Sequence, residues 1–363
     1  MATNLAEFRN LAQDEINKKV NSNQFQSNPL LGLWLGRSRQ AGKLDRPGGL
    51  VQLGGVSVPR LSNITAIPSN VREEPFQTAV QGGGTKPGYR GNSPVINVAT
   101  MVDETLRFYM TDYLQPFKVF HQDLRSSRSP HGTYDLLVTA LDSAMNELEN
   151  DIANDIFRGN PGSQTANVWD DLLGLRVSID DGTNTTTYGG VDKTVTTILK
   201  PALYSETAVA YNWSLHDDVD RTAAALRGPG IDLSICNPNL YYQTIKPKAI
   251  ADGRAVVIEN ASDMPISMQV LGFRNDVVKY GNVHIMSDRN VNDASGSNKS
   301  MLFHLTASDW YMEIDPRENF KVTEITDESL VAGGDLAFSG HIKFSARMFM
   351  RHPKWHGLHT DVA

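Results

Sequence analysis

The sequence contains a single cysteine, Cys236, among its 363 residues. One cysteine excludes an intramolecular disulfide, and the simplest interpretation is a protein of a reducing compartment. Apolar residues alternate with polar ones around Cys236, which predicts a buried structural thiol rather than a nucleophile. The chain also lacks any run of about 20 apolar residues, the length that a membrane-spanning helix needs. Its first residues lack the charged start and apolar core that are typical of a signal peptide.

Positive charge is scarce. The 34 Lys and Arg residues are outnumbered by 41 Asp and Glu residues, which gives a net charge of −7. This balance argues against a protein whose main task is to grip nucleic acid, because phosphates are bound by clusters of basic side chains. The hydrophobic content of 40% is ordinary for a folded protein. The chain is long enough for roughly two domains.

The short motifs of common enzyme families are missing, among them G-x-S-x-G, H-E-x-x-H and C-x-x-C. The stretch at 180–194, DDGTNTTTYGGVDKT, does not fit a phosphate-binding loop, because Asp192 precedes Lys193 where that loop needs glycine. It does not fit an EF-hand, because Asp180 and Asp181 are adjacent and no glutamate closes the loop. Its Asp-Gly, Asn and Gly-Gly residues favour a turn between β elements.

Three histidines near the C-terminus, His352, His356 and His359, are the only candidate metal ligands that their spacing groups. On a helix they would share one face. Pro353 and Gly357 disfavour that helix, and no cysteine or firmly placed carboxylate completes a site. We therefore expect a solvent-exposed tail and no catalytic residue, cofactor-binding residue or metal site. A metal-assisted hydrolase that uses these histidines is the alternative.

Glycine and proline concentrate between Arg37 and Ala99, where short β-prone runs alternate with turns. Such a segment can form a long two-stranded ribbon, but an isolated ribbon is only marginally stable in water. A disordered linker is the other interpretation, but the segment is too apolar for a solvated tether. We therefore expect another surface to cover it.

A long amphipathic helix is the clearest element that the sequence predicts. Leu137, Leu141, Leu148 and Ile152 recur on one helical stripe, and GNPG at 159–162 is a strong stop signal. We expect this helix at 133–158. Ile342–Met348 belongs to a long alternating run, and we expect the helix to pack on the sheet that contains it. Together with the other strand-like runs, this predicts an α+β chain.

The order of these elements resembles the major capsid proteins of tailed bacteriophages, which have the Hong Kong 97-type fold. Residues 28–52 look like an N-terminal arm that enters an extended loop, and 94–106 look like the strand that returns from it. The helix at 133–158 is similar to the spine helix of the peripheral domain. Residues 174–194 and 232–245 resemble the entrance, the strand and the helix of the axial domain, and 335–358 resemble the closing strand of the peripheral domain.

The resemblance implies five segments along the chain. They are an N-terminal arm at 1–36, the extended β-hairpin loop at 37–99, a peripheral domain with the spine helix at 100–170, an axial domain at 171–299, and a return to the peripheral domain with the C-terminal strand at 300–363.

The resemblance also implies a structural protein rather than an enzyme. Many copies would close into pentamers and hexamers of an icosahedral shell around double-stranded DNA, in a virion assembled in the bacterial cytoplasm. Its partners would be further copies of itself, with separate scaffolding, portal and decoration proteins as candidates, and no membrane. A fibre or adhesin subunit remains an alternative beside the hydrolase. The loop residues expected to contact a neighbouring subunit are Leu50, Val51, Leu53, Val56, Val58, Leu61 and Ile64.

Overall fold

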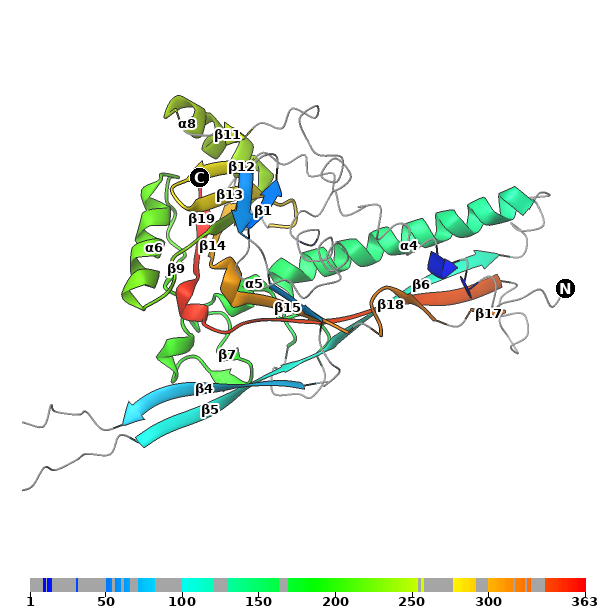
Figure 1. Ribbon diagram of the computed structural model, residues 1–363, viewed down its shortest axis with the longest axis horizontal. Coiled ribbons are helices and arrows are strands. Elements are labelled where there is room, and N and C mark those ends of the chain that lie inside the picture. The colour runs from blue at the N-terminus through cyan, green and yellow to red at the C-terminus, as the bar shows by residue number, and fades with distance from the viewer. Residues whose placement is uncertain are drawn as a thin grey trace, which may run out of the picture.

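The computed structural model describes most of the chain from residue 71 onward. The described ranges are 71–81, 100–120, 130–162, 169–253, 277–291, 300–315, 317–323, 325–327 and 337–363, with strands at 50–53, 56–59, 62–65 and 256–257 and residues 9, 10, 12–14 and 31. Two mixed sheets, one long helix and a projecting two-stranded ribbon make up this part of the molecule (Figure 1).

The six-stranded sheet is built around the longest strand, β18 (Ala337–Met350). One edge of β18 pairs with β6 (Thr111–Phe120), from Ala337 to Ala346. The other edge pairs in turn with β17 (Thr326–Asp327), β16 (Lys321–Val322) and β15 (Trp310–Ile314). Beyond β15 lies β3 (Ser62–Thr65), which runs parallel to it.

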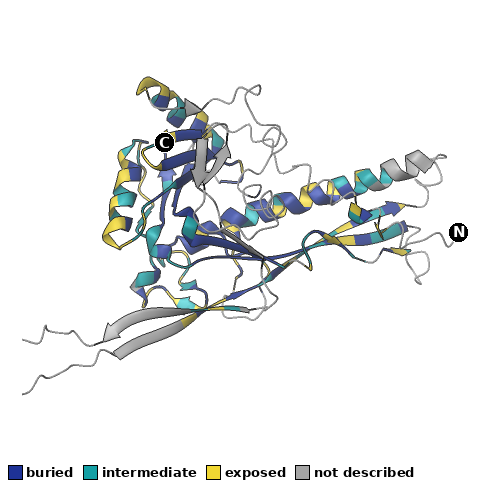
Figure 2. Cartoon of the chain, viewed as in Figure 1, coloured by how far each residue is buried: buried dark blue, intermediate teal, exposed yellow. Residues whose placement is uncertain are grey.

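Helix α4 (Pro130–Arg158) covers one face of this sheet and contacts β6 and β18 (Figure 1). It begins three residues before the predicted start and ends where predicted, with the amide of Gly159 bonded to the carbonyl of Asp155. Leu141, Leu148 and Ile152 of the predicted apolar stripe are buried, whereas the side chain of Leu137 lies outside the described part of the chain. Figure 2 shows buried and exposed residues alternating along this helix. Because α4 has 29 residues, it is about 43 Å long at 1.5 Å per residue.

The seven-stranded sheet has the order β11-β12-β13-β10-β14-β19-β9. The central strand β10 is parallel to β13 and antiparallel to β14. Cys236 lies in β10 and is fully buried, as the sequence predicts. The strands are β11 (Val256–Val257), β12 (Val277–Tyr280), β13 (Val283–Ser287), β10 (Leu233–Cys236), β14 (Ser300–Leu305), β19 (Gly357–Val362) and β9 (Leu203–Ser205).

Helices cover both faces of the seven-stranded sheet. On one face lie α6 (Ser214–Ala225) and a continuous helical run formed by α7 (Pro238–Leu240), a π-helical turn at Tyr241–Ile245 and α8 (Lys246–Ala251). Asn237 begins this run by accepting a hydrogen bond from the amide of Asn239. The C-terminal end of α4 packs on the other face, where Phe157 meets Phe303 at a ring distance of 5.8 Å.

The ribbon consists of β4 (Val71–Gln81) and β5 (Thr100–Tyr109), which pair antiparallel and project away from the body of the molecule (Figure 1). β5 runs almost directly into β6, so the ribbon is continuous with the six-stranded sheet. The hairpin of β7 (Thr187–Tyr188) and β8 (Val191–Asp192) contacts the ribbon at β5. A second small hairpin, β1 (Leu50–Leu53) with β2 (Val56–Pro59), lies elsewhere, away from the ribbon (Figure 1).

Residues 300–363 contribute to both sheets, because β14 and β19 belong to the seven-stranded sheet and β15 and β18 belong to the six-stranded sheet. The chain crosses between the sheets twice in this region. In addition, Ser62–Thr65 pairs with β15 of its own subunit, so this part of 37–99 does have a partner within the chain. The sequence pattern of a short strand carries no information on which edge it joins.

Candidate functional site

The base of the ribbon is fixed to the six-stranded sheet by a network of ion pairs. Arg72 of β4 reaches Glu313 of β15, with Nη1 and Oε1 2.9 Å apart. Glu313 also binds Arg347 of β18, with Oε2 and Nη2 2.5 Å apart, and both side chains are almost fully buried. A buried carboxylate held between two guanidinium groups is strongly destabilised when one partner is removed. This network therefore fixes the direction in which the ribbon leaves the sheet.

The hairpin β7–β8 supports the ribbon from a second side. Gly189 accepts a hydrogen bond from the amide of Arg107 on β5, at 2.9 Å. Gly189 has a φ of 55°, which favours glycine, and a Cβ there would lie 3.1 Å from Cβ of Leu106. The hydroxyl of Tyr188 donates to the carbonyl of Met350 and accepts from its amide, each at 2.7 Å. The prediction of a turn between β elements is confirmed, and the turn joins the ribbon to β18.

Lys193, which the sequence analysis weighed only as the lysine of a phosphate-binding loop, follows this hairpin directly. It is fully buried, and its Nζ donates to the carbonyls of Val177 and Asp180 at 2.6 and 3.0 Å. These carbonyls lie at the end of α5 (Leu175–Ser178), so the lysine satisfies acceptors that the short helix leaves open. Burial lowers the pKa of Lys193 to about 8, although Asp180 and Asp181 act in the opposite direction. Its contacts are structural.

The C-terminal histidines are not in an exposed tail, and that expectation was wrong. His356 is fully buried and His359 is nearly so, because β19 is inserted between β14 and β9. His352 and His356 both contact the buried carboxylate of Asp309, at 2.7 and 3.2 Å. Burial alone would raise the pKa of Asp309, but the hydrogen bonds from the two histidines outweigh it and lower that pKa. Sequence spacing grouped all three histidines, but the structure brings only His352 and His356 together, on Asp309, which lies 43 residues before His352.

His359 belongs to a different group, a hydrogen-bonded chain inside the seven-stranded sheet. We call it the histidine chain, and it consists of Tyr211, His216, Ser234, His304 and His359 in that order. Successive members are 3.1, 3.2, 3.2 and 3.1 Å apart. Burial lowers the pKa of His216 to about 3 and that of His359 to about 4, and it lowers the pKa of His304 well below its usual value. These rings are therefore neutral at physiological pH.

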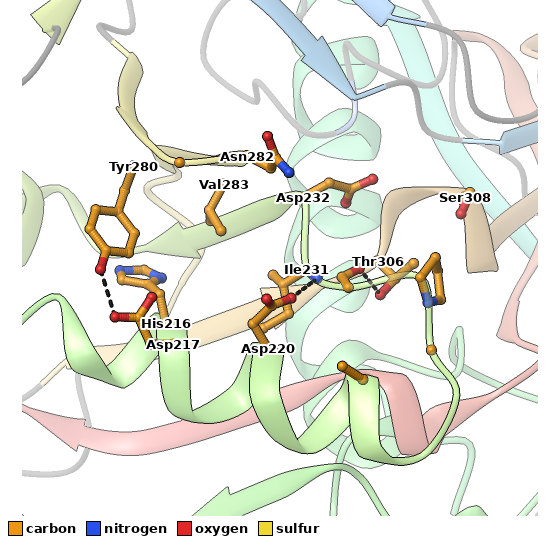
Figure 3. Close-up of a pocket in the computed structure, with 15 residues that line it drawn as sticks. His216, Asp217, Asp220, Ile231, Asp232, Tyr280, Asn282, Val283, Thr306 and Ser308 are labelled. Atoms are coloured by element: carbon orange, nitrogen blue, oxygen red, sulfur yellow. Dashed lines mark hydrogen bonds between the residues drawn. The ribbon is translucent and has the colours of Figure 1, made fainter.

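A cavity of about 410 Å³ opens beside His216, between α6 and the turn that joins β12 to β13 (Figure 3). Its acidic residues already have partners: Asp217 accepts from the hydroxyl of Tyr280 at 2.6 Å, and Asp220 accepts from an amide at 2.9 Å. Burial raises the pKa of Asp232 in its wall to about 6. With its pKa near 3, His216 is a weak base. Within the described ranges, no group of three or more histidine, cysteine or carboxylate side chains is arranged to hold a metal ion.

The loop residues predicted to contact a neighbour lie in three short strands. Leu50, Val51 and Leu53 are in β1, Val56 and Val58 are in β2, and Ile64 is in β3. Leu61 lies outside the described residues. β1 and β2 pair only with each other among the described strands.

The exposed face of β6 is a second candidate contact surface. Leu114 and Phe120 lie on the side of the strand away from α4 and are 56% and 47% exposed. Between them, Lys118 approaches the ring of Phe120 at 5.6 Å. On the neighbouring strand, Lys343 lies opposite Leu114. The side chains of Leu114 and Phe120 are separated by Pro116 and Lys118, so they do not form a continuous apolar patch.

Among the described residues, no helix has the length and apolarity needed to cross a membrane. No protein-family model matches the chain, and no curated protein matches its sequence.

Solved structures do match. A subunit of the cyanophage A-1(L) capsid is similar over 93% of this chain and 93% of its own length, with a TM-score of 0.58 and 13% identity. The capsid of the native GTA particle is similar over 90% of this chain and 99% of its own, with a TM-score of 0.52 and 10% identity. The holo-SrpI encapsulin complex from Synechococcus elongatus PCC 7942 is similar over 90% of this chain and 94% of its own, with a TM-score of 0.50 and 10% identity.

At these identities the likeness concerns the fold. It covers 93% of this chain for the cyanophage capsid subunit and 90% for the GTA capsid. The chain is therefore an α+β protein with the Hong Kong 97-type fold that its sequence predicts, the fold of the subunits that build tailed-phage capsids.

Proposed function

We propose that the chain is the major capsid protein of a tailed bacteriophage. Many copies assemble into pentamers and hexamers of an icosahedral shell, and the shell encloses packaged double-stranded DNA without reading its sequence. The protein is a structural component of the virion and carries no catalytic activity. The observation that carries this proposal is the fold shared with the cyanophage capsid subunit over almost the whole of both chains.

The projecting ribbon supports assembly with copies of the same chain. A two-stranded ribbon cannot bury its side chains alone, and β4–β5 extends away from both sheets. We propose that the loop segment before β3 lies on a neighbouring subunit, with Leu50, Val51, Leu53, Val56, Val58 and Leu61 among the contacts, and that Ile64, whose strand pairs with β15 of its own chain, also reaches that neighbour. Strand and apolar contacts made there would offset the entropy of ordering the segment.

A shell that encloses protein rather than DNA is the second candidate, because an encapsulin also shares the fold over 90% of the chain. Electron microscopy of the purified protein, followed by nuclease treatment and DNA extraction, separates the two. Closed shells that protect DNA from the nuclease after incubation with the packaging machinery would support the capsid function. Shells that retain a protein cargo and never DNA support the second candidate. A stable monomer with no particles would contradict both.

The loop contact is tested in the β1–β2 hairpin. Val51 and Val58 are directly paired in the β1–β2 register, and Gln52 belongs to the next pair, with Ser57. We expect Val51→Asp with Val58→Asp to leave the urea midpoint of the free subunit near that of the wild type and to abolish shells. The control Gln52→Asp should still assemble. Normal shells from the double variant would contradict the proposed contact.

A further inference from the structure

Two long segments connect the sheets as one antiparallel pair. The first runs from β14 to β15, and the second runs from β18 to β19. In the seven-stranded sheet His304 pairs with Gly357, and in the six-stranded sheet Trp310 pairs with Met350. The six residue steps from His304 to Trp310 therefore lie opposite the seven steps from Met350 to Gly357. The two segments keep almost the same register in both sheets, and their pairing is interrupted at 305–309 and 351–356. Each interruption contains one turn of 3₁₀ helix, at Ala307–Asp309 and Pro353–Trp355.

Asp309 holds the two interrupted segments together. Its Oδ2 accepts from the backbone amide of His352 at 2.7 Å and faces Nε2 of His356 at 3.2 Å. Its Oδ1 faces Nδ1 of His352 at 2.7 Å. The carboxylate thus takes the place of ladder hydrogen bonds that the interruption removes.

Donor and acceptor requirements fix the protons in this cluster. The amide of Thr306 donates to Nδ1 of His356 at 3.2 Å, so the hydrogen of a neutral His356 ring is on Nε2 and points at Asp309. Oδ2 of Asp309 then faces two donors, the amide of His352 and the Nε2–H of His356, an arrangement that favours an ionised carboxylate. It is 4% exposed, so these charge-assisted bonds are shielded from water.

The same position is tied to both sheets. On one side, the amide of Ala307 donates to Asp232, which immediately precedes β10, at 2.7 Å. On the other, Tyr188 holds both backbone groups of Met350, the last residue of β18. A change in the bend at 305–309 and 351–356 would therefore change the angle between the two sheets.

We propose that the interrupted pair is a hinge between the two sheets and that Asp309 is the positioning residue that holds it at one angle. The consequence for assembly rests on the proposed function: in a shell built from this chain, the angle between the sheets contributes to the curvature of the wall.

The experiment compares Asp309→Ala and Asp309→Asn with wild type by hydrogen–deuterium exchange of the full-length free subunit. Asp315→Ala is the matched control, because this carboxylate lies just past the other end of β15 and its hydrogen-bond partner in the described part of the chain is the nearby amide of Arg317. In Asp309→Ala we expect exchange at 305–309 and 351–356 to accelerate about tenfold or more, with β10 and α4 unchanged. Asp309→Asn keeps an acceptor but loses the charge, and we expect an acceleration of about threefold at the same amides.

If Asp309→Ala does not fold, the test rests on Asp309→Asn. Amide exchange at wild-type rates at 305–309 and 351–356 in that variant would overturn the proposed hinge. Particle images then test the consequence. We expect the folded Asp309 variants to give shells of altered or heterogeneous diameter, whereas Asp315→Ala gives wild-type shells. Local acceleration with shells of unchanged diameter would overturn the role in curvature. If the wild-type protein forms no shells, the proposed function is refuted. The hinge proposal would still be tested in that case, because the exchange experiment uses free subunits.

Discussion

Acidification should destabilise the subunit through the histidine chain. His216, His304 and His359 are buried and held as neutral rings, while their pKa in the unfolded chain is about 6.5. At a pH between the folded and the unfolded pKa, the unfolded chain binds more protons than the native state. Stability therefore falls as the pH drops below about 6.5, and it stops falling near the folded pKa. The link between His304 and His359, 3.1 Å long, holds only one proton, so charging both rings would set two N–H groups against each other.

The magnitude follows from the two pKa values that burial sets at about 3 for His216 and about 4 for His359. One pKa unit corresponds to about 1.4 kcal/mol, so each of these rings removes about 2 kcal/mol between pH 7 and pH 5. Two carboxyl groups act in the opposite direction. Burial raises the pKa of Asp155 and of Asp232 to about 6, so their protonation stabilises the native state as the pH falls.

A comparison of variants isolates the histidines, because the carboxyl contributions cancel between them. Urea unfolding of the full-length subunit, followed by tryptophan fluorescence at pH 7, 6 and 5, gives the free energy of unfolding at each pH. In His216→Gln we expect the loss between pH 7 and pH 5 to be about 2 kcal/mol smaller than in wild type. The control His341→Gln, at an exposed position, should match wild type. An equal pH dependence in His216→Gln and wild type would refute the reasoning.

Three further predictions concern stability and are checked by urea unfolding. Leu141→Asp should lose about 3–5 kcal/mol, because it places a carboxylate in the fully buried stripe of α4. Glu313→Gln should lose about 3–5 kcal/mol, because it leaves Arg347 buried without its counter-charge, and it should also speed proteolysis of the ribbon. Gly189→Ala should lose about 1–3 kcal/mol through its positive φ and its approach to Leu106. A change below about 0.5 kcal/mol in any of the three would contradict the assigned packing.

Sequence reasoning predicted the elements whose physics is local. The stripe of α4 can be read from its spacing because one helix face supplies all of its buried residues. The end of that helix at Gly159 and the turn at Gly189 and Gly190 follow from glycine. The fold itself was reached through the order of such elements, by resemblance, and the solved capsid structures confirm it.

The parts that were missed depend on contacts between distant segments. The run with the three histidines was expected to be an exposed tail, because Pro353 and Gly357 disfavour a helix and no further ligand nearby completes a metal site. In the structure each ring finds a buried partner far along the chain, as His359 does in His304. Likewise, the residues that flank Asp309 in the sequence do not distinguish it from an aspartate on the surface. Its importance comes from the bend between two strands that only the folded chain brings together.

The ribbon affects the aggregation risk of a subunit before assembly. In the described part of the chain β4 and β5 pair only with each other, so each presents an open edge that could template aggregation. Two features oppose such misuse. Pro75 lacks an amide hydrogen for a third strand, and the irregular pairing between Gln77 and Ala79 twists the edge locally. These features of β4 therefore disfavour non-native edge-to-edge pairing between subunits before they assemble.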